Sequence, residues 1–156
     1  MYRTGIGFDT HKLVRNRKLI LGGVEIHYKK GLLGYSDADV LIHAMMDSIL
    51  GAVGLRDIGV LFPNDNFKFK NISSLVLLKE VYKKIEKEYK ILNLDSIIIC
   101  QAPKLSIYID EMKENVSGVL KTKNINIKAT TTEKMNAEGK GKCISAQAVV
   151  MLEKIV

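Results

Sequence analysis

A short apolar segment, a proline and a helical segment follow one another in the second half of the chain, and their order strongly limits the possible folds. Residues 94–102 are apolar and of strand length, and Pro103 ends the segment because proline cannot donate a backbone hydrogen bond. A helical pattern over residues 108–120 and a strand pattern over residues 125–131 follow. This strand–helix–strand order predicts two parallel strands joined by a right-handed crossover.

The remaining segments complete a single α+β domain. Residues 73–89 have the clearest amphipathic helix pattern, and residues 36–51 predict a helix with Ser36 as its N-cap. Further segments are predicted as a strand at 3–8, a bent extended segment at 18–26, a long loop at 56–70, and at 142–153 a strand or a strand that becomes helical. The order predicts one domain over residues 1–156, with a mixed β-sheet and helices on one face.

Asp9, His11 and His43 are candidate ligands of a metal ion. Residues two apart on a strand project from the same face, so Asp9 and His11 can hold one ion while Thr10 points into the protein. His43, from a helix, would complete the set. Three nitrogen and oxygen ligands without a cysteine favour Zn²⁺ with one position left for water or a substrate oxygen.

The same residue types have a simpler interpretation. An Asp-x-His pair can be an ordinary strand-end hydrogen bond, and a histidine on a helix is often a satisfied core residue. Asp39 and Asp47 favour the metal, because each lies four residues from His43 and shares its helix face. A carboxylate beside a metal-binding histidine commonly fixes its tautomer, so we expect Asp39 and Asp47 to hold His43.

Two polar loops follow predicted strands, where ligands usually bind. Residues 101–106 offer a backbone turn and a lysine, and residues 129–134 gather three threonines, Glu133 and Lys134. Hydroxyls and free amides can hold phosphate oxygens, and Glu133 could hold a second, hard cation such as Mg²⁺. A threonine run is also ordinary strand sequence.

Charge and cysteine content argue against several classes of protein. The net charge of +7 comes from 20 Lys and only 4 Arg, and residues 79–90 interleave lysines with glutamates as a solvated helix face does. We therefore expect attraction of small anionic substrates and no nucleic-acid partner. The start of the chain has no apolar leader and no run approaches a membrane span, so a cytoplasmic protein is expected. Cys100 and Cys143 are expected to be buried free thiols.

Six segments, taken together and in order, resemble the 2-C-methyl-D-erythritol 2,4-cyclodiphosphate synthase family. They run from the first predicted strand to the last, so the resemblance is more specific than any single motif. The segments are Gly7-Phe8-Asp9-Thr10-His11, Gly22-Gly23-Val24, Ser36-Asp37-Ala38-Asp39-Val40, Asp57-Ile58-Gly59, Gln101-Ala102-Pro103-Lys104 and Ala129-Thr130-Thr131-Thr132-Glu133-Lys134.

The resemblance implies an enzyme of the non-mevalonate route to isoprenoids. It implies a homotrimer whose sheets face the central axis, with an active site at each subunit boundary. It also implies cyclisation of 4-diphosphocytidyl-2-C-methyl-D-erythritol 2-phosphate with release of CMP, which is phosphorus–oxygen lyase chemistry. Zn²⁺ on Asp9, His11 and His43 would polarise the attacked phosphorus, and Mg²⁺ or Mn²⁺ near Glu133 would bridge the diphosphate.

The resemblance also assigns roles by position. Residues expected to contact substrate phosphates are Tyr35, Ser36, Thr131 and Thr132. Residues expected to form the cytidine pocket are Cys100, Ala102, Pro103, Lys104, Leu105, Ser106 and Thr130. Residues expected near the ribose and methylerythritol are Asp57, Ile58, Gly59 and Asn64.

Four positions depart from the family pattern. Tyr35 stands where the family commonly has histidine, and Asn64 stands where it has aspartate. Ala137 and Lys140 replace the aromatic residue and the arginine that often line the trimer cavity, so a regulatory isoprenoid-diphosphate site on the axis is not expected. Tyr35 and Asn64 keep one alternative open, a catalytically retired member that senses cytidine nucleotides or metal. A generic zinc phosphohydrolase is a second alternative. We interpret the changes as tuning, because every expected zinc ligand is kept.

Overall fold

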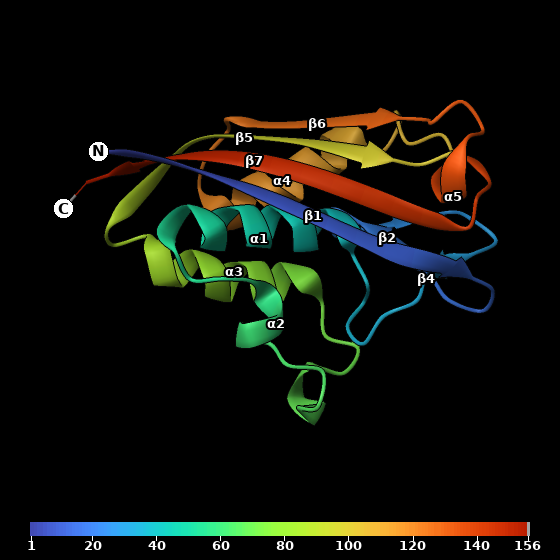
Figure 1. Ribbon diagram of the computed structural model, residues 1–156, viewed down its shortest axis with the longest axis horizontal. Helices are drawn as coiled ribbons and strands as arrows, with labels where there is room; N and C mark the ends of the chain where they lie inside the picture. Colours follow the sequence, from blue (N-terminus) through green and yellow to red (C-terminus); the bar gives the residue numbers. More distant parts are fainter. Residues whose placement is uncertain (156) are drawn as a thin grey trace.

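A five-stranded mixed sheet forms one layer of the protein (Figure 1). The structure is a computed structural model that describes residues 1–155. In spatial order the strands are β4 (Gly31–Leu32), β1 (Tyr2–Val14), β7 (Cys143–Lys154), β5 (Tyr89–Ile99) and β6 (Ile125–Thr130). Neighbouring strands are antiparallel except for β5 and β6, which are parallel. The parallel pair predicted around the crossover helix is therefore confirmed.

The long helices lie together on one side of this sheet (Figure 1). They are α1 (Val40–Val53), α3 (Ser74–Ile85) and α4 (Ile109–Leu120). Shorter elements are the hairpin of β2 (Leu19–Leu21) and β3 (Val24–Ile26), helices α2 (Ile58–Leu61) and α5 (Asn136–Gly139), and the 3₁₀ turn η1 (Phe67–Phe69). Along β7, Ala146 and Ala148 are buried while Gln147 and Val149 are exposed, so only one face of the sheet is covered. The predicted α+β architecture is confirmed.

Helix α1 is the centre of the core. It contacts β1 and β7 on one side and α3 on the other, and side chains all round it are buried. It begins at Val40, with Asp39 as the N-cap: the Asp39 carboxylate accepts a hydrogen bond from the Ile42 N–H, 3.2 Å away. The prediction of Ser36 as N-cap was wrong, because an aspartate closer to the apolar run satisfies the free amides of the first turn.

Strand β1 is longer than the predicted strand at 3–8 and carries Asp9 and His11 in its second half. Side chains alternate between the two faces of a strand, so Thr10, between Asp9 and His11, projects to the open face of the sheet. There its hydroxyl contacts the Ser145 hydroxyl. The expectation that Thr10 points into the protein was wrong. Asp9 and His11 are on the helix-covered face, which is the face that can reach α1.

Three predicted boundaries also change. Helix α3 ends at Ile85, and Tyr89 already belongs to β5 because it pairs with Lys154 of β7. Strand β7 continues to Lys154, so the alternative of a helical end is wrong. The predicted loop at 56–70 contains α2 and η1, since Asp57 and Asn66 each accept a hydrogen bond from a backbone N–H and start a short turn. No helix in the described part of the chain is long and apolar enough to cross a membrane.

Candidate active site

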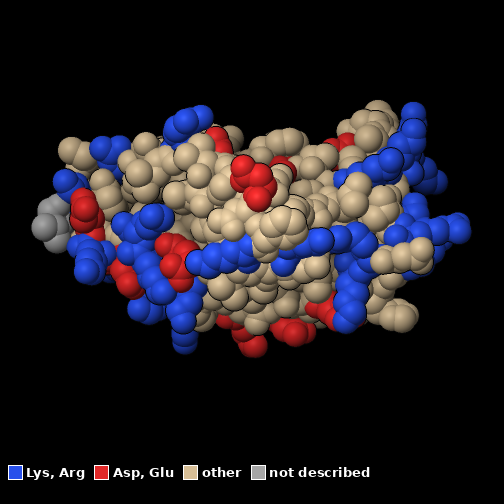
Figure 2. Space-filling view, turned by 90° about the horizontal axis from the view of Figure 1, so that it is seen from below, with Lys and Arg blue, Asp and Glu red and all other residues tan. Residues whose placement is uncertain are grey.

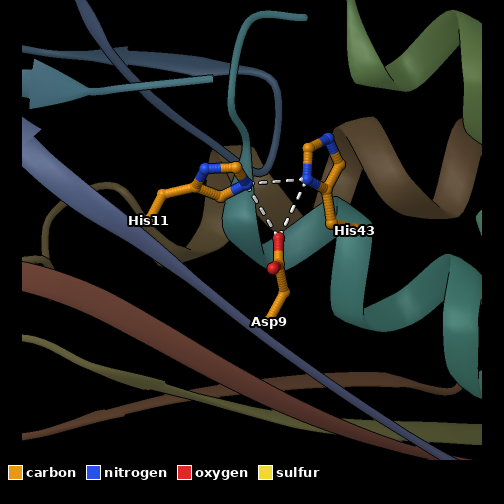
Figure 3. A group of neighbouring side chains, drawn as sticks. All are labelled: Asp9, His11 and His43. Atoms are coloured by element: carbon orange, nitrogen blue, oxygen red, sulfur yellow. Dashed lines mark hydrogen bonds and ion pairs between the residues drawn. The ribbon is translucent and has the colours of Figure 1, made fainter. Parts of the chain in front are cut away.

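Asp9, His11 and His43 converge at one point between β1 and α1 (Figure 3). Asp9 Oδ2 lies 2.9 Å from His11 Nε2 and 2.9 Å from His43 Nδ1. The two ring nitrogens are 3.2 Å apart. Among the described residues, this is the one group of three or more histidine, cysteine or acidic side chains whose ligand atoms lie close enough to share a metal ion. The two remote segments therefore meet as predicted.

The spacing of these three atoms fits a small divalent ion. Zinc bonds of about 2.0–2.2 Å in a tetrahedral site place donor atoms about 3.3–3.6 Å apart, so the ligands need to move outward by only a few tenths of an ångström. The observed separations of 2.9 to 3.2 Å are close to that range. The donors are two nitrogens and one oxygen, a set that suits Zn²⁺ and leaves a fourth position for an external oxygen. The residues present fit the predicted metal.

The histidine tautomers agree with this role. His11 Nδ1 lies 2.7 Å from the Leu33 carbonyl oxygen, which only accepts hydrogen bonds. The proton of neutral His11 is therefore on Nδ1, and the lone pair of Nε2 faces the centre of the group. On the far side of His43, Nε2 contacts the hydroxyls of Ser74 at 3.0 Å and Ser36 at 3.2 Å.

Electrostatics keep Asp9 ionised. Burial alone would raise the pKa of the Asp9 carboxyl, but without a metal ion the His11 and His43 rings donate to the carboxylate when they are protonated, and these contacts outweigh burial and hold the pKa well below its usual range. Burial lowers the pKa of His11, yet Asp9 and the Leu33 carbonyl together raise it above its usual value. A carboxylate that stays charged at every physiological pH is a suitable metal ligand.

Asp39 and Asp47 do not hold His43, so that prediction was wrong. The buried Asp39 carboxylate accepts hydrogen bonds from the N–H groups of Gly22 at 3.0 Å and Gly23 at 2.7 Å, and so fixes the β2–β3 turn to the start of α1. Asp47 accepts a hydrogen bond from the Ile58 N–H at 2.8 Å. Both aspartates share a helix face with His43, but their carboxylate oxygens accept hydrogen bonds from backbone amides of other segments. Helical spacing cannot reveal these amides.

A pocket of about 250 Å³ opens from the metal-ligand group. It brings together the ligands with five of the predicted substrate residues, which are Tyr35, Ser36, Ile58, Gly59 and Asn64. Asp57 is not among its lining residues and instead caps α2 by accepting a hydrogen bond from the Val60 N–H. The apolar wall of Phe62, Phe69 and Leu77 was not predicted, since it comes partly from the turn that the sequence indicated only as loop.

A second pocket, of about 400 Å³, lies where β5 and β6 end. Residues of the predicted cytidine pocket that line it are Cys100, Pro103, Lys104, Leu105, Ser106 and Thr130. Ala102 belongs to the same turn, and its carbonyl accepts a hydrogen bond from the Cys100 thiol at 3.1 Å. Ile109, from the first turn of α4, adds an apolar side chain that the sequence did not indicate. The predicted nucleotide residues therefore lie together.

The threonine run continues from this second pocket. Thr131 lines the pocket, and its hydroxyl donates a hydrogen bond to Glu133 at 2.7 Å. Thr132 instead donates to the Met135 carbonyl at 2.7 Å and supports the turn into α5. Glu133 is exposed. Thr131 and Glu133 are exposed and bonded to each other, whereas the less exposed Thr132 is bonded to the start of α5.

The two pockets share no lining residue: the first lies beside β1 and α1, and the second lies where β5 and β6 end. The strand register relates them. Thr10 of β1, between the metal ligands Asp9 and His11, pairs with Ser145 of β7, which pairs with Ile99 of β5. Ile99 pairs with Thr130 of β6, which lines the second pocket, so both pockets lie at the same level along the strands. Strands are about 4.8 Å apart, which separates β1 from β6 by about 14 Å.

Basic side chains are spread over the face of the molecule shown in Figure 2 and do not form a single patch there. On the face shown in Figure 2, lysines and arginines run along the length of the molecule, and acidic groups lie among them. This distribution agrees with the interpretation of the lysine-rich segment as a solvated surface.

Comparison with known proteins identifies the family. Residues 2–153 match the YgbB family. The chain is 60% identical over 153 residues to 2-C-methyl-D-erythritol 2,4-cyclodiphosphate synthase of Clostridium acetobutylicum, covering 96% of this chain and 99% of the relative. It is 55% identical over 155 residues to the synthase of Caldicellulosiruptor bescii, covering 97% and 99%.

Solved structures agree with this result. The bifunctional IspDF of Campylobacter jejuni superposes with a TM-score of 0.95 at 41% identity, over 99% of this chain and 43% of that protein. IspF of Plasmodium falciparum, solved as a CDP complex, has a TM-score of 0.86 at 36% identity, over 98% of this chain and 96% of that one. The chain therefore belongs to the YgbB family, the family of the 2-C-methyl-D-erythritol 2,4-cyclodiphosphate synthases.

Proposed function

We propose that the protein converts 4-diphosphocytidyl-2-C-methyl-D-erythritol 2-phosphate into 2-C-methyl-D-erythritol 2,4-cyclodiphosphate and CMP, as a phosphorus–oxygen lyase of isoprenoid synthesis. The observation that carries the proposal is the convergence of Asp9, His11 and His43 beside a pocket of about 250 Å³, in a chain 60% identical to a synthase of that name. The bond that forms joins the 2-phosphate to the β-phosphorus, and the bond that breaks releases CMP.

The reaction must bring one anionic phosphate against another, so its barrier is largely electrostatic. A Zn²⁺ ion held by Asp9, His11 and His43 would supply Lewis-acid polarisation of a phosphoryl oxygen. Ser36 and Tyr35 line the same pocket and can donate hydrogen bonds to phosphate oxygens. Asn64, Ile58 and Gly59 also line this pocket and are proposed to contact the methylerythritol. No protein nucleophile is needed, because the substrate carries its own.

The second pocket is proposed to bind the cytidine. Its turn of residues 100–106 offers backbone groups to the base, and Lys104 offers a cation near the diphosphate. Glu133 and Thr131 would help to hold a Mg²⁺ or Mn²⁺ ion, which would neutralise negative charge on the diphosphate. Thr132 contributes mainly by holding the loop.

A homotrimer is proposed to complete each active site. The open face of the sheet carries exposed apolar side chains, among them Ile6, Phe8 and Val149, which a partner subunit would cover. The separation of the two pockets in one chain supports a site that takes its metal side from one subunit and its nucleotide side from the next. The cytoplasmic location stays a prediction from the sequence.

The test is incubation of the purified protein with the substrate, Zn²⁺ and Mg²⁺, with the products separated and identified by mass spectrometry. The expected result is CMP together with the cyclic diphosphate in equal amounts. Nucleotide binding without CMP release would instead indicate a retired, sensing member of the family. CMP with a ring-opened product would indicate a phosphohydrolase.

A further inference from the structure

Asp37 and Ser74 form a hydrogen-bonded chain that ends on His43. Ser74 is the first residue of α3, and its hydroxyl oxygen lies 2.5 Å from Asp37 Oδ1 and 3.0 Å from His43 Nε2. Asp37 Oδ2 also accepts a hydrogen bond from the Ser74 backbone N–H, at 2.9 Å. One carboxylate therefore fixes both polar groups of Ser74.

The protons in this chain can be assigned. An ionised carboxylate only accepts hydrogen bonds, so the single hydroxyl proton of Ser74 lies toward Asp37. The Ser74 oxygen then presents a lone pair to His43 Nε2, which must carry the proton between them. Ser74 is 0% exposed and His43 7% exposed, so solvent does not compete for these groups.

This arrangement opposes the effect of Asp9. The Asp9 carboxylate, 2.9 Å from His43 Nδ1, would by itself favour a proton on Nδ1, and a protonated nitrogen cannot bind a metal. In the neutral ring, a proton on Nε2 leaves the Nδ1 lone pair directed at Asp9 and His11. The tautomer that is competent for metal binding thus depends on the groups behind the ring.

We propose that Asp37 and Ser74 are positioning residues, which hold His43 in the tautomer that presents an unprotonated Nδ1 to the metal. The proposal rests on the metal role of Asp9, His11 and His43 in the proposed function. It also gives the start of α3 a task beyond packing, since the same serine both begins that helix and orients a ligand on α1. Ser36 is a weaker support, because its oxygen lies 3.2 Å from Nε2 and also accepts a hydrogen bond from the Ala38 N–H.

The chain offers a matched control beside the key residue. Ser73 is exposed and makes no side-chain hydrogen bond at the start of α3. Ser73→Ala therefore removes the same hydroxyl group as Ser74→Ala, but removes no contact with His43. Zinc affinity is measured by competition with a chromogenic chelator in Ser74→Ala, Ser73→Ala and the unmodified protein. Loss of such a supporting contact typically weakens metal binding about 10–100-fold, which we expect for Ser74→Ala alone.

A second measurement distinguishes a change in the His43 tautomer from a general loss of stability around the site. The side-chain ¹⁵N shifts of His43 in the metal-free protein report which nitrogen carries the proton. We expect the Nε2–H form in the unmodified protein and in Ser73→Ala, and a shift toward Nδ1–H in Ser74→Ala. If Ser74→Ala does not fold, Asp37→Asn serves in its place, because an amide has only one acceptor oxygen for the two donors of Ser74.

The outcomes distinguish this proposal from the proposed function. Unchanged zinc affinity and an unchanged His43 tautomer in the folded variant would overturn the role of Asp37 and Ser74, even if the unmodified enzyme makes the cyclic product. Weakened zinc binding with the expected tautomer shift would support that role, even if no CMP were released. In that case only the proposed reaction would fail.

Discussion

Gly7 of β1 lies so close to Ala44 of α1 that a β-carbon at position 7 would come within 1.9 Å of the Ala44 carbonyl oxygen. The contact is between backbones, so no flexible side chain can move away. It occurs two residues before Asp9 and one residue after His43, and it therefore sets the distance between the elements that carry the metal ligands.

Replacing Gly7 with alanine should push β1 away from α1. Overpacking of this kind costs about 3 kcal/mol of unfolding free energy or more, and zinc affinity should fall because Asp9 moves relative to His43. Urea unfolding at fixed protein concentration and chelator competition measure the two effects.

Gly118→Ala is the control for this substitution. Gly118 is exposed in α4 with open space around it, so alanine should stabilise the protein by about 0.5–1 kcal/mol. Equal stability of Gly7→Ala and the unmodified protein would contradict the close contact.

His43→Ala should remove zinc and turnover while the protein stays folded. The substitution deletes one of three ligands but leaves Asp9, His11 and the surrounding core in place. Zinc content after gel filtration, CMP release and circular dichroism measure the three quantities. His27→Ala provides the comparison, because His27 is exposed on the loop after β3 and belongs to neither pocket. Normal zinc content in His43→Ala would refute the ligand assignment.

Asp47→Ala should weaken substrate binding more than it slows the chemical step. The carboxylate accepts the Ile58 N–H and so fixes α2, which forms one wall of the metal-side pocket. Loss of this bond should cost about 0.5–1.5 kcal/mol of stability and raise KM several-fold with kcat nearly unchanged. Steady-state CMP release measures both constants. Asp47→Asn keeps an acceptor oxygen and should restore KM; a KM that is equally high in both variants would show that this hydrogen bond is not the cause.

The Cys100 thiol should be inert at neutral pH. Burial disfavours the thiolate and raises the pKa of Cys100 to about 11 from 9.0. A raised pKa means fewer thiolates at any lower pH, about one in a thousand at pH 8. Alkylation followed by peptide mass spectrometry should therefore speed up about tenfold per pH unit up to about 11. In urea, where the pKa returns to its usual value, the rate should level off above about pH 9. Rapid alkylation of the folded protein at pH 7 would disagree with the burial.

Val149→Asp should give a monomer that cannot turn over substrate. Val149 is 48% exposed on the open face of β7, opposite Ile6 of β1, and a charge there would be buried in the proposed trimer. Light scattering after size-exclusion chromatography measures the mass, and zinc content should be retained because the ligands face the other side of the sheet. Val76→Asp, a similarly exposed valine on α3, should remain trimeric. A monomer with full specific activity would exclude a site shared between subunits.

The sequence predicted those parts of the fold that depend on local pattern. The β5–α4–β6 unit follows from an apolar strand, a proline and an amphipathic helix. Helix α4 and strand β6 lie within one residue of their predicted bounds, whereas β5 runs from Tyr89 to Ile99 and not over residues 94–102. Residue type and spacing singled out Asp9, His11 and His43 as candidates, but only the folded chain shows that their two segments meet. The same holds for the turn at residues 100–106, which lines one pocket.

The parts that were missed depend on contacts between distant segments. Helical spacing places Asp39 and Asp47 beside His43, but their oxygens are used by Gly22, Gly23 and Ile58, which only the folded chain brings near. Ser74 is 31 positions from His43. Its sequence neighbours indicate the start of a helix and nothing about the ring that it faces. Partner choice among polar groups is a property of tertiary structure.

The two ends of the described chain lie side by side (Figure 1). The Lys154 N–H donates a hydrogen bond to the Met1 carbonyl, 2.8 Å away. Strand β1 then rises about 3.3 Å per residue, so Tyr2 and Asp9 are separated by about 23 Å. Both pockets sit at the opposite end of the same strands. A tether, an affinity tag or a second folded module could thus be joined at either terminus without obstructing the entry of a substrate.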